Sequence, residues 1–119
     1  MEESPSPEIA AVGLTEDEAM KDHELQIGRF PFEASGMAAI LDETKGFVKI
    51  ISEKRYNRIL GVHIVGPSAT QLIAEAALAI NLECTPREIV DTIHSHPSLS
   101  EAFWESALAV SGESIHFPS

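Results

Sequence analysis

The 119-residue chain is predicted to be one small α+β domain, an antiparallel sheet with helices packed on it. Segments with strand patterning lie in the middle of the chain, and segments with helix-start signals follow them. Strands and helices do not alternate strictly, as they would in a doubly wound parallel fold. With 44% hydrophobic and 23% charged residues, the chain also has enough apolar side chains for a core.

Three segments carry strand signals. Residues 25–30 alternate apolar and polar side chains, while residues 47–51 and 59–65 are rich in β-branched residues. The polar residues 52–58 between the last two segments predict an antiparallel hairpin with a longer loop.

Helix starts are indicated by the pattern Ser/Thr-x-x-Glu/Gln. In this pattern the hydroxyl caps the first turn, and the acid or amide reaches back to the N–H of the capping residue. The pattern predicts helices over about 16–21, 69–82, 86–93 and 99–110, and it occurs at Thr15/Glu18, Ser68/Gln71, Thr85/Glu88 and Ser98/Glu101. Pro86 supports the third helix, because a missing N–H costs nothing at the first helical position.

The predicted helix 69–82 has no clear polar face. From Leu72 to Ile80 every residue except Glu75 is apolar. A domain of this size cannot easily bury a helix on all sides. Two explanations stay open: a partner subunit or a further domain covers this helix, or it is the central helix of the core.

Charge and composition exclude several functional classes. The net charge is −11, and residues 1–24 carry eight acids and one base, so we expect a solvated acidic segment there and no nucleic-acid partner. No stretch approaches the ~20 apolar residues of a membrane helix, and the acidic start does not resemble a signal peptide. The single cysteine, Cys84, excludes an internal disulfide and fits a reducing compartment, which predicts a cytoplasmic location. Residues 1–6 are interpreted as a linker or cut end, and residues 7–119 as the domain.

The densest polar cluster is the segment 94–101, H-S-H-P-S-L-S-E. Pro97 disfavours helical geometry for His96, so a loop between two helices presents the imidazole. Glu101, one turn into the next helix, can fold back toward His96, fix its tautomer and raise its basicity. The two residues are therefore a candidate acid/base pair, with a capping role for Glu101 as the alternative.

Other polar side chains are weaker candidates. His94 and His96 resemble a metal-binding pair, but no third His or Cys lies nearby in the sequence, so we predict no metal site. His63 is expected to be a strand residue at a packed surface. Cys84 has no adjacent base and is expected to be an inert packed thiol.

Three motifs resemble one enzyme family in the right order. The segment 94–101 resembles the H-x-H-P-[ST]-L-S-E signature of the dihydrolipoamide dehydrogenase group of pyridine nucleotide-disulfide oxidoreductases. Residues 46–50 and 58–67 resemble its G-F-x-K-[IV] and I-L-G-x-H-[IV]-[IV]-G motifs, and residues 7–16 resemble the start of the same domain. The likeness covers about 7–117, nearly the whole chain.

The resemblance implies the C-terminal interface domain, or dimerisation domain, of a homodimeric FAD- and NAD-dependent enzyme. In that family the residue matching His96 reaches the partner subunit's redox disulfide and flavin, and it takes the proton from a dihydrolipoamide thiol. The resemblance also implies that Pro97 lies near the same flavin and that the His96–Pro97 bond is usually cis. It implies further that Glu101 forms a hydrogen bond with His96. It further implies that partner contact covers the helix 69–82. Lipoyl-bearing proteins of 2-oxo acid dehydrogenase or glycine cleavage complexes are the implied partners.

The chain also departs from the family pattern. The G-x-G-x-x-G of the FAD site, the NAD domain and the redox C-x4-C pair are absent from the sequence. We therefore expect this chain alone to be inactive and to bind neither cofactor. The alternative interpretation is a free-standing acidic dimerisation or protein-interaction module without catalysis.

Overall fold

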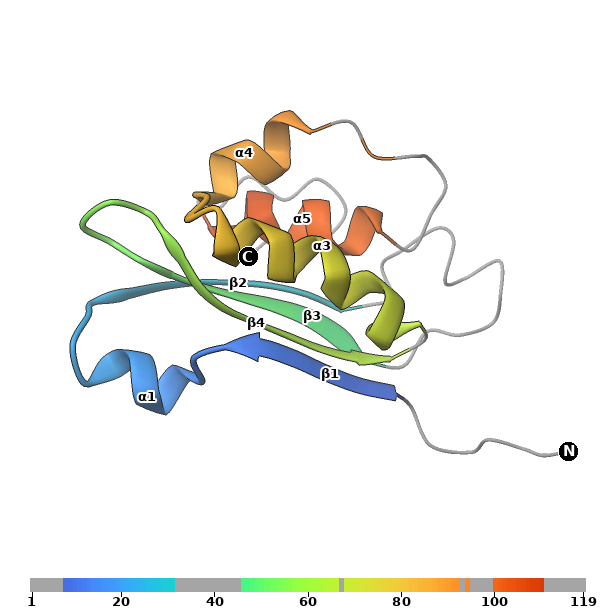
Figure 1. The fold of residues 1–119 in the computed structure, drawn as a ribbon, viewed down its shortest axis with the longest axis horizontal. Helices are drawn as coiled ribbons and strands as arrows, with labels where there is room; N and C mark the ends of the chain where they lie inside the picture. The colour runs from blue at the N-terminus through green and yellow to red at the C-terminus, as the bar shows by residue number, and fades with distance from the viewer. Residues whose placement is uncertain (1–7, 32–45, 67, 93, 95–99, 111–119) are drawn as a thin grey trace, which may run out of the picture.

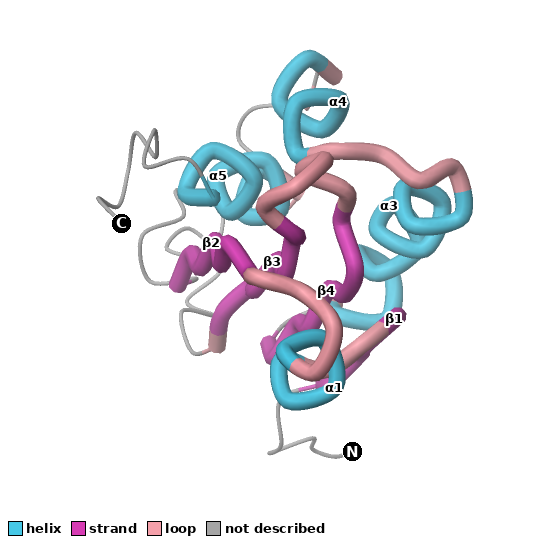
Figure 2. Tube along the Cα trace, turned by 90° about the vertical axis from the view of Figure 1, so that its left-hand side faces the viewer, coloured by secondary structure: helices cyan, strands magenta, loops and turns pink. Residues whose placement is uncertain are grey.

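The computed structural model describes residues 8–31, 46–66, 68–92, 94 and 100–110. In this part of the chain, three helices cover one face of a four-stranded antiparallel sheet and a short helix lies against the other face (Figures 1 and 2). The predicted α+β class is confirmed. The elements are, in order, β1 Glu8–Gly13, α1 Glu16–Met20, β2 Leu25–Pro31, β3 Phe47–Glu53, β4 Ile59–Gly66, α3 Ala69–Asn81, α4 Pro86–Asp91 and α5 Glu101–Val110. None of these helices is long and apolar enough to cross a bilayer.

The sheet has the order β1-β4-β3-β2, and each neighbouring pair is antiparallel. The predicted hairpin is confirmed as β3–β4, with Ile50 opposite Val62. Because side chains alternate along a strand, one set of apolar residues faces the helices and the other faces α1. The main core joins this first set to the helices through Phe30, Val48, Ile50, Val62, Ile64, Ala76, Phe103 and Ala107. On the opposite face, Ala19 of α1 covers Ile51 and Leu60.

The strand β1 was missed by the sequence analysis, which placed its first strand at residue 25. The segment E-I-A-A-V-G has two alanines and weak strand propensity, so local signals do not mark it. Pairing with β4 along the whole strand, from Glu8 opposite Gly66 to Gly13 opposite Gly61, makes it an edge strand. Tertiary pairing therefore orders part of the acidic segment.

The start of α3 is capped differently from the prediction. Ser68 has a left-handed backbone with φ 59°, and its side chain makes no capping hydrogen bond, so the predicted Ser68/Gln71 box is wrong. Instead, the carboxylate of Glu8 accepts hydrogen bonds from the backbone N–H and hydroxyl of Thr70, at 3.1 and 3.0 Å. A carboxylate at a helix N-terminus is favourable because it satisfies an unpaired N–H and faces the positive end of the helix dipole. The edge strand thus stabilises the helix that packs beside it.

The side of α3 that faces away from the sheet is apolar and exposed. Ala69, Ala76 and Ala79 are buried against the sheet, whereas Leu78 and Leu82 are 59% and 63% exposed. The interpretation of this helix as a central core helix is therefore wrong, because the described residues bury only one side of it.

Two of the other predicted caps are present. The backbone N–H of Glu18 donates to the Thr15 hydroxyl and that of Thr15 to the Glu18 carboxylate, and this bond lowers the pKa of Glu18. In the second cap, the Glu88 carboxylate accepts from both the backbone N–H and the hydroxyl of Thr85. The fourth predicted cap involves Ser98, which lies outside the described residues.

The helices flanking residues 95–99 are shorter than predicted. The helix α4 ends at Asp91 because Thr92 turns to an extended backbone, with ψ 134°. The helix α5 starts at Glu101, where the prediction placed the start at residue 99.

A close backbone contact holds α5 against the sheet. A Cβ atom at Gly28 of β2 would lie 2.1 Å from the backbone oxygen of Ser106, so only glycine allows this approach. The Ser106 hydroxyl is buried and donates to the backbone oxygens of Gly28 and Val48, at 2.9 and 3.3 Å. These contacts fix the position of α5, and with it the position of Glu101.

We predict that Gly28→Ala lowers the free energy of unfolding by about 3 kcal/mol, the upper end of what overpacking costs. The added methyl group would force α5 away from β2. Urea unfolding followed by circular dichroism measures the change. Arg29→Ala, at the neighbouring exposed position of β2, is the control and should cost less than about 1 kcal/mol. Equal losses in the two variants would contradict the close-packing argument.

Candidate active site

The described residues provide the two ends of the predicted catalytic loop. His94 follows α4, and Ser100 precedes Glu101 at the start of α5. His96, Pro97 and the bond between them lie outside the described residues. The structure therefore describes the residues on either side of this loop.

His94 is held at both ring nitrogens. Its Nε2 lies 2.6 Å from a carboxylate oxygen of Glu75 in α3, and its Nδ1 lies 2.8 Å from the backbone oxygen of Thr92. The His94 side chain is only 6% exposed, while Glu75 is partly exposed. Such short contacts with ionisable groups are among the stronger hydrogen bonds in proteins.

The two neighbours of the His94 ring restrict where its protons lie. A backbone carbonyl can only accept, so Nδ1 carries a proton and donates it to Thr92. The Nε2 atom faces the Glu75 carboxylate. Both ring nitrogens are thus engaged with protein groups.

A second set of contacts holds the start of α5. The indole N–H of Trp104 donates to the backbone oxygen of Val90 in α4 at 2.9 Å. The backbone oxygen of Ser100 accepts from the N–H groups of Phe103 and Trp104 at 3.1 and 3.3 Å. The end of α4 and the beginning of α5 are therefore tied together on either side of residues 95–99.

A hollow of about 300 Å³ lies between these supports. Its described lining residues are Val90, Asp91, Thr92, His94, Glu101 and Trp104. The predicted acid Glu101 is half-buried and shares this hollow with His94. The structure therefore brings Glu101 to one end of the predicted loop and the anchored His94 to the other.

The remaining polar candidates lie elsewhere in the fold. His63 is a half-buried strand residue as predicted, and its Nε2 lies 3.0 Å from the backbone oxygen of Leu14. Cys84 is half-buried and packs against the main core. Among the described residues, no group of three or more His, Cys, Asp and Glu side chains could hold a metal ion.

The sequence analysis missed Glu75 and Trp104 as supports of this site. One available signal was that Glu75 is the single polar residue between Leu72 and Ile80. Its partner could not be inferred, because His94 is 19 residues away and reaches it only in the folded chain.

Most of the chain matches one protein family. Residues 5–107 match the family described as the pyridine nucleotide-disulphide oxidoreductase dimerisation domain. The chain belongs to this family. The relationship predicted from the three motifs is thereby confirmed.

Similar proteins are named as dihydrolipoyl dehydrogenases. The dimerisation domain is 54% identical over 113 residues to one from Bacillus subtilis, covering 94% of this chain and 24% of that protein. It is 43% identical to dihydrolipoyl dehydrogenase 1, mitochondrial, of Arabidopsis thaliana, covering 92% of this chain and 22% of that protein. The chain thus spans about a quarter of the length of these relatives.

Solved structures share the same fold. LpdA from Mycobacterium tuberculosis superposes with a TM-score of 0.80 at 30% identity, covering 85% of this chain and 22% of that one. The HOCl-induced flavoprotein disulfide reductase RclA from Escherichia coli gives a TM-score of 0.77 at 23% identity, covering 87% and 23%. The second likeness concerns the fold alone.

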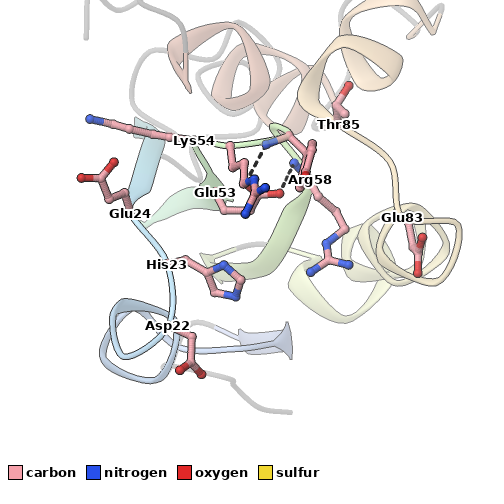
Figure 3. Close-up of a pocket in the computed structure, with 10 residues that line it drawn as sticks. Asp22, His23, Glu24, Glu53, Lys54, Arg58, Glu83 and Thr85 are labelled. Atoms are coloured by element: carbon pink, nitrogen blue, oxygen red, sulfur yellow. Dashed lines mark hydrogen bonds between the residues drawn. The ribbon is translucent and has the colours of Figure 1, made fainter.

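The dimerisation domain has a larger hollow, of about 890 Å³, beside the β3–β4 turn (Figure 3). Its lining mixes acids and bases: Asp22, His23, Glu24, Glu53, Lys54, Arg55, Tyr56, Arg58, Glu83 and Thr85. Glu53 is only 3% exposed and accepts hydrogen bonds from the N–H groups of Tyr56 and Arg58, at 2.8 and 3.4 Å. The bond from Tyr56, followed by that from Arg58, lowers the pKa of Glu53 below its ordinary value of 4.5. This acid therefore holds the turn in place.

We predict that Glu53→Gln lowers the melting temperature at pH 7 by about 5 °C, because an amide oxygen is a weaker acceptor for two N–H groups. The folded-state pKa of Glu53 is lowered, so the stabilisation is present above pH 4.5 and disappears as the pH falls through the folded-state pKa. Thermal melts from pH 7 to pH 3 should show the two proteins converging. Glu83→Gln, an exposed position of the same hollow, is the control; a pH-independent difference for Glu53→Gln would contradict the assignment.

Proposed function

We propose that this dimerisation domain is the C-terminal interface domain of a dihydrolipoyl dehydrogenase. The observation that carries the proposal is the 54% identity to the Bacillus subtilis enzyme over 94% of the chain. The segment H-S-H-P-S-L-S-E supports lipoamide as the disulfide substrate, because glutathione reductases usually have H-P-T-S-S-E at this place. The catalysed reaction would be FAD-dependent oxidation of dihydrolipoamide with reduction of NAD.

The exposed side of α3 supports a role in forming the homodimer. Ala74, Ala77 and Leu78 of this helix and its C-cap residue Leu82 are exposed and form an apolar stripe, here called the α3 stripe. Contiguous apolar surface of this kind is typical of a contact with another protein. Burying the α3 stripe against a second subunit would remove it from water.

In this proposal His96 acts as the base for the substrate thiol. The imidazole takes the proton from one dihydrolipoamide thiol, and the resulting thiolate attacks a sulfur of the partner subunit's redox disulfide, releasing the other sulfur as a thiolate. Glu101 would accept a hydrogen bond from His96 and stabilise the imidazolium. The position of Glu101 at the first residue of α5, facing the hollow between the loop ends, supports this role.

The cofactors would be bound outside this chain. Its sequence contains neither a G-x-G-x-x-G loop nor a C-x4-C pair, so its residues do not fit an FAD, NAD or redox-disulfide site. In the longer enzyme, FAD and NAD bound by other parts of the protein would supply the redox chemistry. Pro97 would lie beside the partner's flavin, and the substrate would arrive on a lipoyl-bearing protein of a 2-oxo acid dehydrogenase or glycine cleavage complex. The reducing cytoplasm is the proposed location.

We predict that His96→Gln, in the full-length enzyme that contains this domain, lowers lipoamide turnover about 10²–10⁴-fold. Flavin-linked diaphorase activity with an artificial acceptor should fall far less, because that reaction needs no thiol deprotonation. Steady-state assays of both reactions measure the ratio, and His23→Gln is the control. Equal losses in both reactions would indicate that the substitution damages the fold or the dimer, and they would argue against His96 as the base. Unchanged lipoamide turnover would show that His96 is not the base.

The role of the α3 stripe has its own test. Leu78→Glu in the same enzyme places a charge in the proposed interface and should convert the dimer to monomer at micromolar concentration, as analytical ultracentrifugation would show. Met20→Glu is the matched control, because Met20 is also 60% exposed but lies on α1, across the sheet. A Leu78→Glu protein that stays dimeric would exclude the α3 stripe as the interface.

A further inference from the structure

Beyond the base itself, we propose that Glu75 and His94 are positioning residues, a pair that holds the loop in which His96 is presented. The inference rests on the proposed function, because it assigns these residues a part in the same thiol deprotonation. The observation behind it is the buried contact of 2.6 Å between Nε2 of His94 and the carboxylate of Glu75.

The pair joins the loop to a rigid part of the fold. Glu75 lies in the middle of α3, which packs on β1 and β4 and is capped from β1 by Glu8. His94 belongs to the connection that leaves α4 after Asp91. The hydrogen bond therefore ties a connecting segment to a helix that is anchored on the sheet.

The geometry at His94 restricts its ring more than a single hydrogen bond would. The Nδ1 atom donates to Thr92 at 2.8 Å while Nε2 is bound to Glu75, so rotation of the ring breaks both contacts. His94 lies two residues before His96. On the other side of residues 95–99, the backbone oxygen of Ser100 is bound to the first turn of α5.

Other roles for His94 fit the contacts less well. Both ring nitrogens already face protein acceptors, so the ring has no free position to take a proton from a substrate. The described residues offer no third ligand that would make the pair a metal site. A buried, fully engaged His next to a candidate catalytic loop is suited to orienting that loop, as the groups behind a metal-bound His orient the ligand.

The test compares substitutions of similar shape in the full-length enzyme. Glu75→Met removes the acceptor but keeps the length of the side chain, and His94→Phe removes both nitrogens but keeps a ring. Each should lower lipoamide turnover about tenfold, far more than diaphorase activity, because a displaced base loses its alignment with the thiol. Glu75→Gln keeps an acceptor oxygen and should retain most of the turnover. The double variant should be no worse than the poorer single one, since the two residues act together.

The pH profile separates positioning from stability. At a pH above the thiol pKa of the substrate, the thiolate forms without a base, so a deficit that acts through His96 should shrink. A deficit caused by a weakened fold would not shrink in this way. Arg87→Met, an exposed substitution on α4, is the control and should leave the ratio of the two activities unchanged.

Each possible result either supports or overturns the positioning role of Glu75 and His94. If His96→Gln loses lipoamide turnover but Glu75→Met and His94→Phe do not, the positioning role is wrong while the proposed function stands. Parallel loss of both activities, or equal activity of Glu75→Gln and Glu75→Met, would also overturn it. If His96→Gln itself keeps full lipoamide turnover, the proposed role of His96 as the base is wrong and this inference falls with it.

Discussion

The backbone contact between β2 and α5 is the constraint on which the rest of this domain depends. Gly28 has no side chain, so α5 can lie directly on the sheet, and the buried Ser106 hydroxyl binds two strand carbonyls there. With α5 in this place, Trp104 reaches α4 and Glu101 faces the hollow beside His94. The framework of the candidate site therefore follows from how one helix packs.

The helix α3 makes three kinds of contact, and sequence patterns within the helix predict none of the partners. Its inner side packs on β1 and β4, its first turn is capped by Glu8, and its single mid-helix acid, Glu75, holds His94. Its outer side is apolar and exposed. One helix thus links the edge of the sheet to the candidate loop while leaving a surface suited to a second subunit. An interface and a catalytic loop supported by the same helix would be coupled mechanically, since a shift of α3 moves Glu75.

Sequence reasoning succeeded where the signal is local. The strands 25–30, 47–51 and 59–65 and the caps at Thr15 and Thr85 depend on neighbouring residues, and the structure contains them all. It failed where a distant partner decides. The Ser68/Gln71 pattern satisfies the local rule, but Ser68 is left-handed and Glu8, 62 residues from Thr70, provides the cap. The strand β1 went unnoticed for the same reason, because its pairing partner lies in β4.

The amino-acid sequence by itself determined the family, the α+β class and the candidate pair His96 and Glu101, because motifs, alternation and helix-start patterns are properties of short segments. Only the tertiary structure decided that Glu75 pairs with His94, that Trp104 ties α5 to α4, and that Leu78 of α3 is exposed. The physical reason is that hydrogen bonds and burial depend on which surfaces meet in space. Those meetings are set by the packing of helices on the sheet, which no single segment encodes.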